Sequence, residues 1–284
     1  MSDPPSDHAC APQPAVAIPV HKPELSAAER LSLEHTVELL AGWPLFVIGP
    51  DRLGGSLDAL CRRHGPRLGC KTYPDRYFAS IGGYNALMRA KAFYESFGPY
   101  SHLLIAQLDA LVLSDELEAW CRRGYSYIGA PWFVGGSEPR LPLEFWGVGN
   151  GGFSLRDIAD FLRVLNTPRR IPNFIKSRAG GKAGITGLPR RIKHERCFAY
   201  NVEPLFPRSN EDHFWGILVP AVYPFFRVAP PEVALGFAFE AAPRLAYGLN
   251  GQRLPFGCHA WERYDRAFWT EQLAFLRNAA ATSA

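Results

Sequence analysis

Short clusters in this 284-residue chain combine residue types that can take part in bond-making chemistry. Asp109 follows an apolar run, and His259 lies in the sequence Gly-Cys-His-Ala-Trp. The neighbours Glu211 and Asp212 stand shortly before the aromatic pair Phe-Trp. A carboxylate can bind a divalent cation or accept a proton, and a neutral imidazole can ligate a metal. These residues therefore indicate acid–base or metal-assisted chemistry.

Asp109 lies where a buried strand is expected to end. Residues 103–106 are all apolar, which is typical of a strand buried on both faces of a parallel sheet. A carboxylate inside such a strand would be costly, so we expect the strand to end near Gln107. Asp109 would then be exposed at the carboxyl end of the strand, where open α/β sheets bind ligands. Alternatively, Asp109 caps the following turn, and Ser114 and Asp115 start the next helix.

A glycine-rich segment, Gly147-Val-Gly-Asn-Gly-Gly152, lies in the middle of the chain. Glycines allow backbone N–H groups to approach a ligand closely, and the asparagine adds donors and acceptors. As a dinucleotide-binding fingerprint the segment is weak, because no acidic residue follows a second strand at the expected offset. The alternative is a tight, bulged turn without a ligand.

The segment around Asp212 is expected to begin a helix after Pro207, with Ser209 or Asn210 as its cap. In the functional interpretation one of its two carboxylates is a general base at the mouth of a pocket. In the structural interpretation both carboxylates only complement the helix dipole. His259 also has two interpretations, because a single histidine can be structural or can ligate a metal.

The composition is that of a globular enzyme, with 47% apolar residues and 13% aromatic residues. No run approaches the ~20 apolar residues of a membrane span. The polar, proline-rich start, residues 1–14, has no signal pattern, so we expect a disordered leader and a cytoplasmic protein. The six cysteines form no Cys-x-x-Cys pair, which argues against a zinc ribbon or a redox motif.

The segment from Pro168 to Arg196 is strongly basic. It holds nine Lys or Arg residues and a single acid, Glu195, for a net charge of +8, so the remainder of the +4 chain carries −4. We interpret it as a long basic loop that attracts phosphate or anionic lipid headgroups, compatible with peripheral association at the inner membrane face. A solvated surface excursion is the alternative. Sparse aromatic residues argue against nucleic-acid binding.

The hydrophobic patterns predict alternating strands and helices. Expected strands lie at 15–20, 44–48, within 71–78, before Asp109, at 125–128 and within 145–155. Expected helices lie after Ser26, with Glu29 completing a capping box, and at 56–64, 84–97, 115–123 and 156–165. The βαβαβ order predicts an α/β fold with a mostly parallel sheet flanked by helices.

Taken in order, these clusters resemble the core of GT-A nucleotide-sugar-dependent glycosyltransferases. Gln107-Leu-Asp109 occupies the place of that family's Asp-x-Asp motif, followed by a glycine-rich loop, an x-Glu-Asp motif and a C-terminal histidine. The pattern Gly-Cys-His-Ala-Trp also resembles a little-characterised bacterial glycosyltransferase-like family that shares the Gln-x-Asp strand. The resemblance covers residues 15–261.

The resemblance implies a set of site residues. Donor binding would fall to Val20, His21, Lys22, Gln107, Asp109, Gly149, Asn150, Gly151 and Gly152. Asp109 and His259 would ligate Mn²⁺ or Mg²⁺, and Asp212 or Glu211 would be the catalytic base. Gln107 departs from the family carboxylate, which lowers the expected cation affinity and allows metal-independent action.

The implied activity is transfer of a sugar from a nucleoside-diphosphate donor to a hydroxyl acceptor, with inversion, in glycan, glycolipid or polysaccharide synthesis. The expected organisation is the leader, a single GT-A-like (Rossmann-like) domain over 15–270, and a tail over 271–284. Residues 15–130 would bind the nucleotide and 131–270 the acceptor. A nucleotide-dependent oxidoreductase or epimerase, and a non-catalytic sugar-nucleotide-binding protein, are the alternatives.

Overall fold

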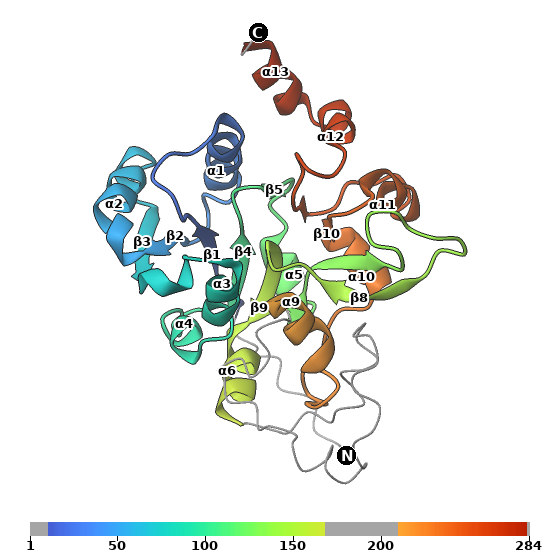
Figure 1. Ribbon diagram of the computed structural model, residues 1–284, viewed down its shortest axis with the longest axis horizontal. Coiled ribbons are helices and arrows are strands. Elements are labelled where there is room, and N and C mark those ends of the chain that lie inside the picture. Colours follow the sequence, from blue (N-terminus) through green and yellow to red (C-terminus); the bar gives the residue numbers. More distant parts are fainter. Residues whose placement is uncertain (1–10, 168–209, 283–284) are drawn as a thin grey trace, which may run out of the picture.

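The computed structural model describes residues 11–167 and 210–282, and its centre is a six-stranded sheet with the order β3-β2-β1-β4-β9-β6 (Figure 1). The strands are β1 (Pro14–Pro19), β2 (Leu45–Pro50), β3 (Leu68–Tyr73), β4 (His102–Ala106), β6 (Tyr127–Ile128) and β9 (Phe153–Asp157). The strands from β3 to β4 pair in parallel, whereas β9 is antiparallel to both β4 and β6. The predicted α/β class with a mainly parallel sheet is confirmed.

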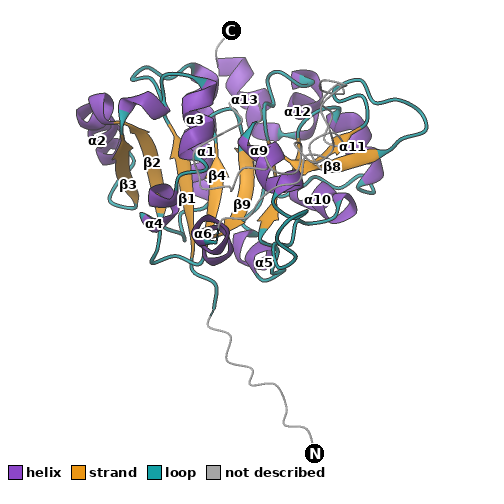
Figure 2. Ribbon diagram, turned by 60° about the horizontal axis from the view of Figure 1, so that its bottom comes forward, coloured by secondary structure: helices purple, strands orange, loops and turns teal. Residues whose placement is uncertain are grey.

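Helices cover both sides of this sheet (Figure 2). Those of the first half are α1 (Ala27–Leu39), α2 (Gly54–Arg63), α3 (Ile81–Leu87) and α4 (Lys91–Glu95), with short 3₁₀ turns at Asp51–Leu53 and Asp75–Tyr77. Alternate residues of one strand enter different cores: Val16 and Ile18 pack on one side of the sheet, Ala15 and Ala17 on the other. Burial on both faces explains why β1 and residues 103–106 of β4 are apolar.

The capping box predicted for α1 is present. The Ser26 hydroxyl accepts a hydrogen bond from the Glu29 N–H at 3.2 Å, and the Glu29 carboxylate accepts one from the Ser26 N–H at 2.7 Å. Two backbone donors that the helix leaves unpaired are thereby satisfied.

The single helix predicted over 84–97 was wrong, because the chain forms α3 and α4 with a bend between them. The carbonyl of Met88 explains the bend. It accepts hydrogen bonds from the Tyr94 hydroxyl at 2.7 Å and the Trp215 indole at 3.0 Å, rather than from the fourth residue along a continuing helix. Hydrogen bonds from aromatic side chains, one of them far along the chain, therefore override a continuous helical pattern.

The rest of the described chain consists of shorter elements. The helices are α5 (Leu117–Cys121), α6 (Ile158–Asn166), α9 (Glu211–His213), α10 (Pro231–Phe237), α11 (Pro243–Leu249), α12 (Arg266–Gln272) and α13 (Ala274–Thr282), and a π-helical turn, η3 (Phe214–Leu218), follows α9. Two small sheets join β7 (Ala130–Phe133) with β8 (Phe145–Gly149), and β5 (Leu111–Val112) with β11 (Gly257–Cys258) and β10 (Ala238–Phe239).

Some expectations fall on other parts of the chain. The basic segment from Pro168 to Arg196 lies outside the described residues, as do the first ten residues of the predicted leader. Most of the expected C-terminal tail belongs to α13. None of the helices within 11–167 and 210–282 has the length and apolarity needed to cross a membrane.

Candidate functional site

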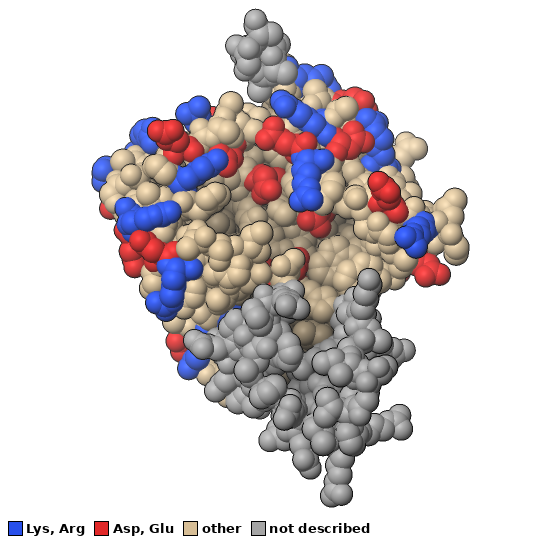
Figure 3. Space-filling model, in the orientation of Figure 1, with Lys and Arg blue, Asp and Glu red and all other residues tan. Residues whose placement is uncertain are grey.

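A cavity of about 690 Å³ opens at the carboxyl ends of β1 and β4. Its walls include Gln107 and Asp109 after β4, the glycines Gly151 and Gly152, and Asp212 at the start of α9. The space-filling view shows this face hollowed, with acidic side chains in and around the hollow (Figure 3). The prediction that this strand ends near Gln107 is confirmed, because β4 ends at Ala106, and the Asp109 side chain is 51% exposed.

Asp109 and His259 are brought together by two very short strands. Leu111 of β5 pairs with Cys258 of β11, and the Trp261 N–H donates to the Asp109 carbonyl at 3.3 Å. As a result, Asp109 Oδ1 lies 3.3 Å from His259 Nε2.

His259 stands between two carboxylates. Its Nδ1 is 2.9 Å from Glu240 Oε1, while Nε2 faces Asp109 without a well-aligned hydrogen bond. Burial disfavours the imidazolium, but the neighbouring Asp109 and Glu240 raise the pKa of His259 to about 10. Burial also opposes ionisation of Asp109, yet His259 and the Arg263 guanidinium lower the pKa of that carboxyl. The two acidic oxygens and the ring thus favour a bound positive charge, either a proton or a metal ion.

The glycine-rich loop is closely packed against this array. A Cβ at Gly152 would overlap the His259 imidazole, and one at Gly151 would overlap the Glu211 carboxylate. Asn150 has a left-handed backbone, with φ of 86°, and its side-chain oxygen accepts from the N–H groups of Gly152 and Phe153. The loop therefore needs glycine where it borders the cavity, and Asn150 acts by shaping the loop.

Gly149 does not line the cavity. It lies under the ring of Trp132, where a Cβ would overlap the indole. Its missing side chain serves packing between β7 and β8.

Asp212 lines the cavity beside Gly151. Burial raises the pKa of the Asp212 carboxyl, and the charge of Glu240 adds to this effect, although the N–H groups of His213, Gly151 and Asn150 oppose it. A carboxylate with a raised pKa is better matched to accepting a proton near neutral pH.

Glu211 has a different environment from its neighbour. Its side chain is 3% exposed, and Oε1 accepts from Arg156 Nη2 at 2.9 Å, while Arg156 is fully buried. The Glu211 N–H donates to the Asn85 side chain at 3.1 Å, which fixes the start of α9. Among the described residues, Oε2 of Glu211 has no hydrogen-bond partner.

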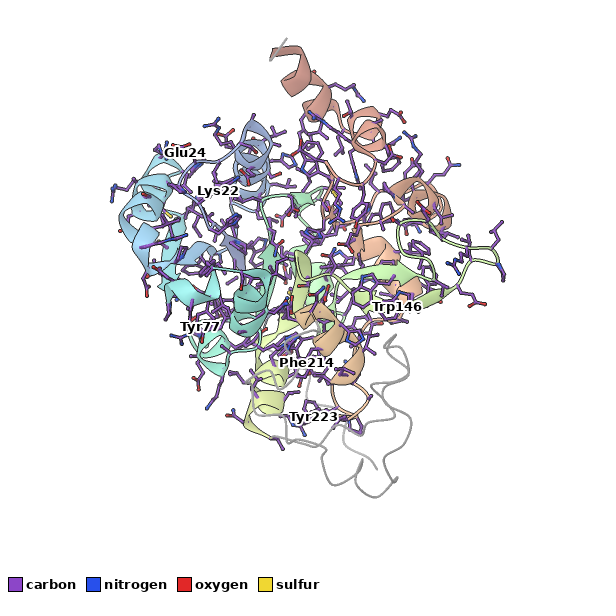
Figure 4. All side chains as sticks on the ribbon, in the orientation of Figure 1. Lys22, Glu24, Tyr77, Trp146, Phe214 and Tyr223 are labelled. Atoms are coloured by element: carbon purple, nitrogen blue, oxygen red, sulfur yellow. The ribbon has the colours of Figure 1, made fainter. Side chains whose placement is uncertain are left out.

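The residues after β1 are divided between core, cavity and surface. Val20 is 1% exposed and belongs to the core, whereas His21 lines the cavity. Lys22 forms an ion pair with Glu29 at 2.9 Å, at the left of the molecule in Figure 4. Of the three residues expected to bind the donor, His21 is the one on the cavity wall.

Two residues of the site were missed from the sequence. Arg263 lines the cavity four residues after His259, and the Glu240 carboxylate contacts the His259 imidazole. Glu240 follows the apolar pair of β10, so an acidic residue directly after a short strand was a usable signal, as it was for Asp109.

Solved structures with related shapes include sugar transferases. The galactosyltransferase LgtC, crystallised with donor and acceptor sugar analogues, aligns over 94% of this chain and 95% of its own, with 13% identity and a TM-score of 0.47. Mouse xyloside xylosyltransferase 1 in its apo form aligns over 86% and 96%, with 11% identity and a TM-score of 0.45. No curated protein matches the sequence.

One family model covers most of the chain. It matches residues 67–259, a span that begins just before β3 and ends at His259. Asp109, Asp212 and Glu240 all lie within it. The chain therefore belongs to the family described as "Protein of unknown function (DUF5672)".

Proposed function

We propose that this protein is a glycosyltransferase that moves a sugar from a nucleoside-diphosphate donor to a hydroxyl acceptor. The observation that carries the proposal is the convergence of Asp109, His259 and Asp212 on one cavity at the carboxyl edge of the sheet. Such a cavity offers a site for a cation and its phosphates next to a buried carboxylate that can take a proton.

The geometry around His259 fits a divalent cation. Glu240 is placed to accept from Nδ1, so Nε2 can ligate a metal ion that displaces its proton, together with Asp109 Oδ1 at 3.3 Å. A carboxylate that orients a histidine from behind is typical of metal-binding histidines. Asp109 and His259 would therefore hold Mn²⁺ or Mg²⁺.

The ion would take few protein ligands. Within 11–167 and 210–282, no group of three or more His, Cys, Asp or Glu residues is arranged to hold a metal. Mg²⁺-type ions usually keep several waters and bind substrate phosphates. When bound, such an ion would supply positive charge that stabilises the departing diphosphate.

Arg263 also supports binding of a phosphorylated donor in this cavity. It lines the cavity and its charge acts on Asp109. A guanidinium is well suited to phosphate oxygens, which it can bind through two parallel N–H groups. We assign Arg263 to the donor diphosphate.

The transfer step uses Asp212. The acceptor oxygen attacks the anomeric carbon as the bond from that carbon to the phosphate oxygen breaks, and the bonding electron pair leaves with the nucleoside diphosphate. The acceptor proton passes to the Asp212 carboxylate. One displacement of this kind inverts the anomeric centre. Glu211 is less suited to this role because Arg156 already binds its carboxylate.

The proposal is tested by thermal-shift and calorimetric titration of sugar nucleotides with and without Mn²⁺, followed by product analysis. Binding that requires Mn²⁺ and is lost in D109N supports the site. Binding without any transfer would indicate the non-catalytic protein suggested by Gln107. Nicotinamide-cofactor binding with no sugar-nucleotide binding would contradict the proposal in favour of an oxidoreductase or epimerase.

A further inference from the structure

Two indole rings form a stacked pair on the β7–β8 hairpin. The rings of Trp132 and Trp146 have their centroids 4.6 Å apart and their planes within 18° of each other. Trp132 pairs with Gly147 and Phe133 with Phe145, so Trp146 lies at an irregularity in the register where it has no opposite residue. Such bulges redirect a side chain and are frequent next to functional sites.

The Trp132 ring of the pair is held against β8. A Cβ at Gly149 would overlap the Trp132 indole, and one at Gly147 would approach both this ring and Ile217. Because glycine stands at both positions, Trp132 can lie on the backbone of β8 and support Trp146 from one side.

The Trp146 ring is open to solvent. Trp146 is 44% exposed, which is unusual for a side chain with so much apolar surface. Since Trp132 covers one face of the indole, the exposed surface lies on the other side. The pair therefore presents a flat aromatic surface on a supported base.

This surface lies beside the residue that follows the proposed base. The ring centroid of Trp146 is 6.2 Å from that of His213, the residue after Asp212. Figure 4 shows Trp146 on β8 beside the segment that carries Phe214, the residue after His213. Beyond Trp146, β8 runs into the glycine loop that borders the cavity.

We propose that Trp146, supported by Trp132, binds the acceptor and that the acceptor is a pyranose-containing carbohydrate. The apolar C–H face of a pyranose ring packs on an indole, while its hydroxyl groups remain free to reach Asp212. That the bound sugar is the acceptor rests on the proposed function. That a sugar binds here is argued only from the geometry of the hairpin.

The test uses the full-length protein and methyl pyranosides of glucose, galactose and N-acetylglucosamine as probes. Their binding is measured by saturation-transfer NMR with the donor pocket filled by a nucleoside diphosphate and diamagnetic Mg²⁺. W146A should weaken binding of the preferred pyranoside about tenfold, the scale of one aromatic contact. W146F should retain part of the affinity. Nucleotide affinity should stay unchanged in both variants.

Leu141 provides a matched control on the same hairpin. It is 86% exposed and apolar but lies in the loop between the two strands, outside their paired residues. L141S should bind the pyranosides as the wild type does. An equal loss in L141S would show generic apolar binding and overturn the proposal, as would unchanged affinity in W146A.

Failure of this proposal and of the proposed function can be told apart. If no pyranoside binds the wild-type protein while sugar nucleotides do, the proposed role of the aromatic surface is wrong and the transferase assignment stands. If pyranosides bind through Trp146 but sugar nucleotides do not, the aromatic surface is a carbohydrate-binding site, and the assignment of its ligand as the acceptor is overturned.

Discussion

The two halves of the molecule build the cavity in different ways. In the first half, regular parallel strands end at a common edge and place Gln107 and Asp109 there. In the second half, Asp212 lies in a three-residue helix, and Glu240 and His259 each follow a two-residue strand. The first wall depends on local sequence patterns, whereas the second depends on packing between segments far apart in the chain.

The neighbours Glu211 and Asp212 show the same contrast on a smaller scale. Both side chains border the cavity, but the Glu211 carboxylate is nearly fully buried and is paired with Arg156. We therefore expect the chemical role and the structural role to separate between adjacent carboxylates.

The largest expected effect is on folding. R156M leaves the Glu211 carboxylate buried without its partner, which should lower the free energy of unfolding by about 3–5 kcal/mol. Chemical denaturation measures this change. R122M is the control, because Arg122 pairs with Glu118 on the surface and should contribute below about 1 kcal/mol. Similar small losses of unfolding free energy in both variants would show that the buried Arg156–Glu211 pair contributes no more than a surface pair.

A large effect on catalysis is expected at Asp212. D212N keeps the shape of the side chain but cannot accept a proton, so transfer should fall by about 10²-fold or more. Donor affinity and melting temperature should be nearly unchanged. Initial-rate assays with the donor that binds best measure the loss. Normal transfer by D212N would eliminate this residue as the base.

A smaller effect is expected at Glu240. E240L removes the carboxylate that orients His259, so Mn²⁺ affinity in the presence of nucleotide should fall by about 10–100-fold. Calorimetry measures the change. E232Q is the control, since Glu232 is exposed on α10 and has no place in the cavity. Equal Mn²⁺ affinity in E240L and the wild type would argue against the metal site.

The smallest effect tests the regular half of the molecule. S26A removes the hydroxyl that caps α1 and should cost about 1 kcal/mol of stability. S56A, an exposed serine within α2, should change stability by less than about 0.5 kcal/mol. Denaturant midpoints of both variants provide the comparison, and a loss in S56A equal to that in S26A would contradict the capping assignment.

The regular half was also the more predictable one. The strand before Asp109 and the capping box of Ser26 follow from local patterns, and both were found from the sequence. Glu240 was missed because its role depends on the contact with His259. The split of the helix over 84–97 was missed because Trp215, far along the chain, binds the Met88 carbonyl.

The pairing of β5 with β11 has a consequence for how this protein is made. Asp109 and His259 are far apart in the sequence, and they meet only when two-residue strands associate. Long-range contacts of this kind form late in folding. A growing chain would thus complete the wall that carries Gln107 and Asp109 before it has any complete site. A ligand that binds both walls would favour the finished fold over every intermediate that precedes it.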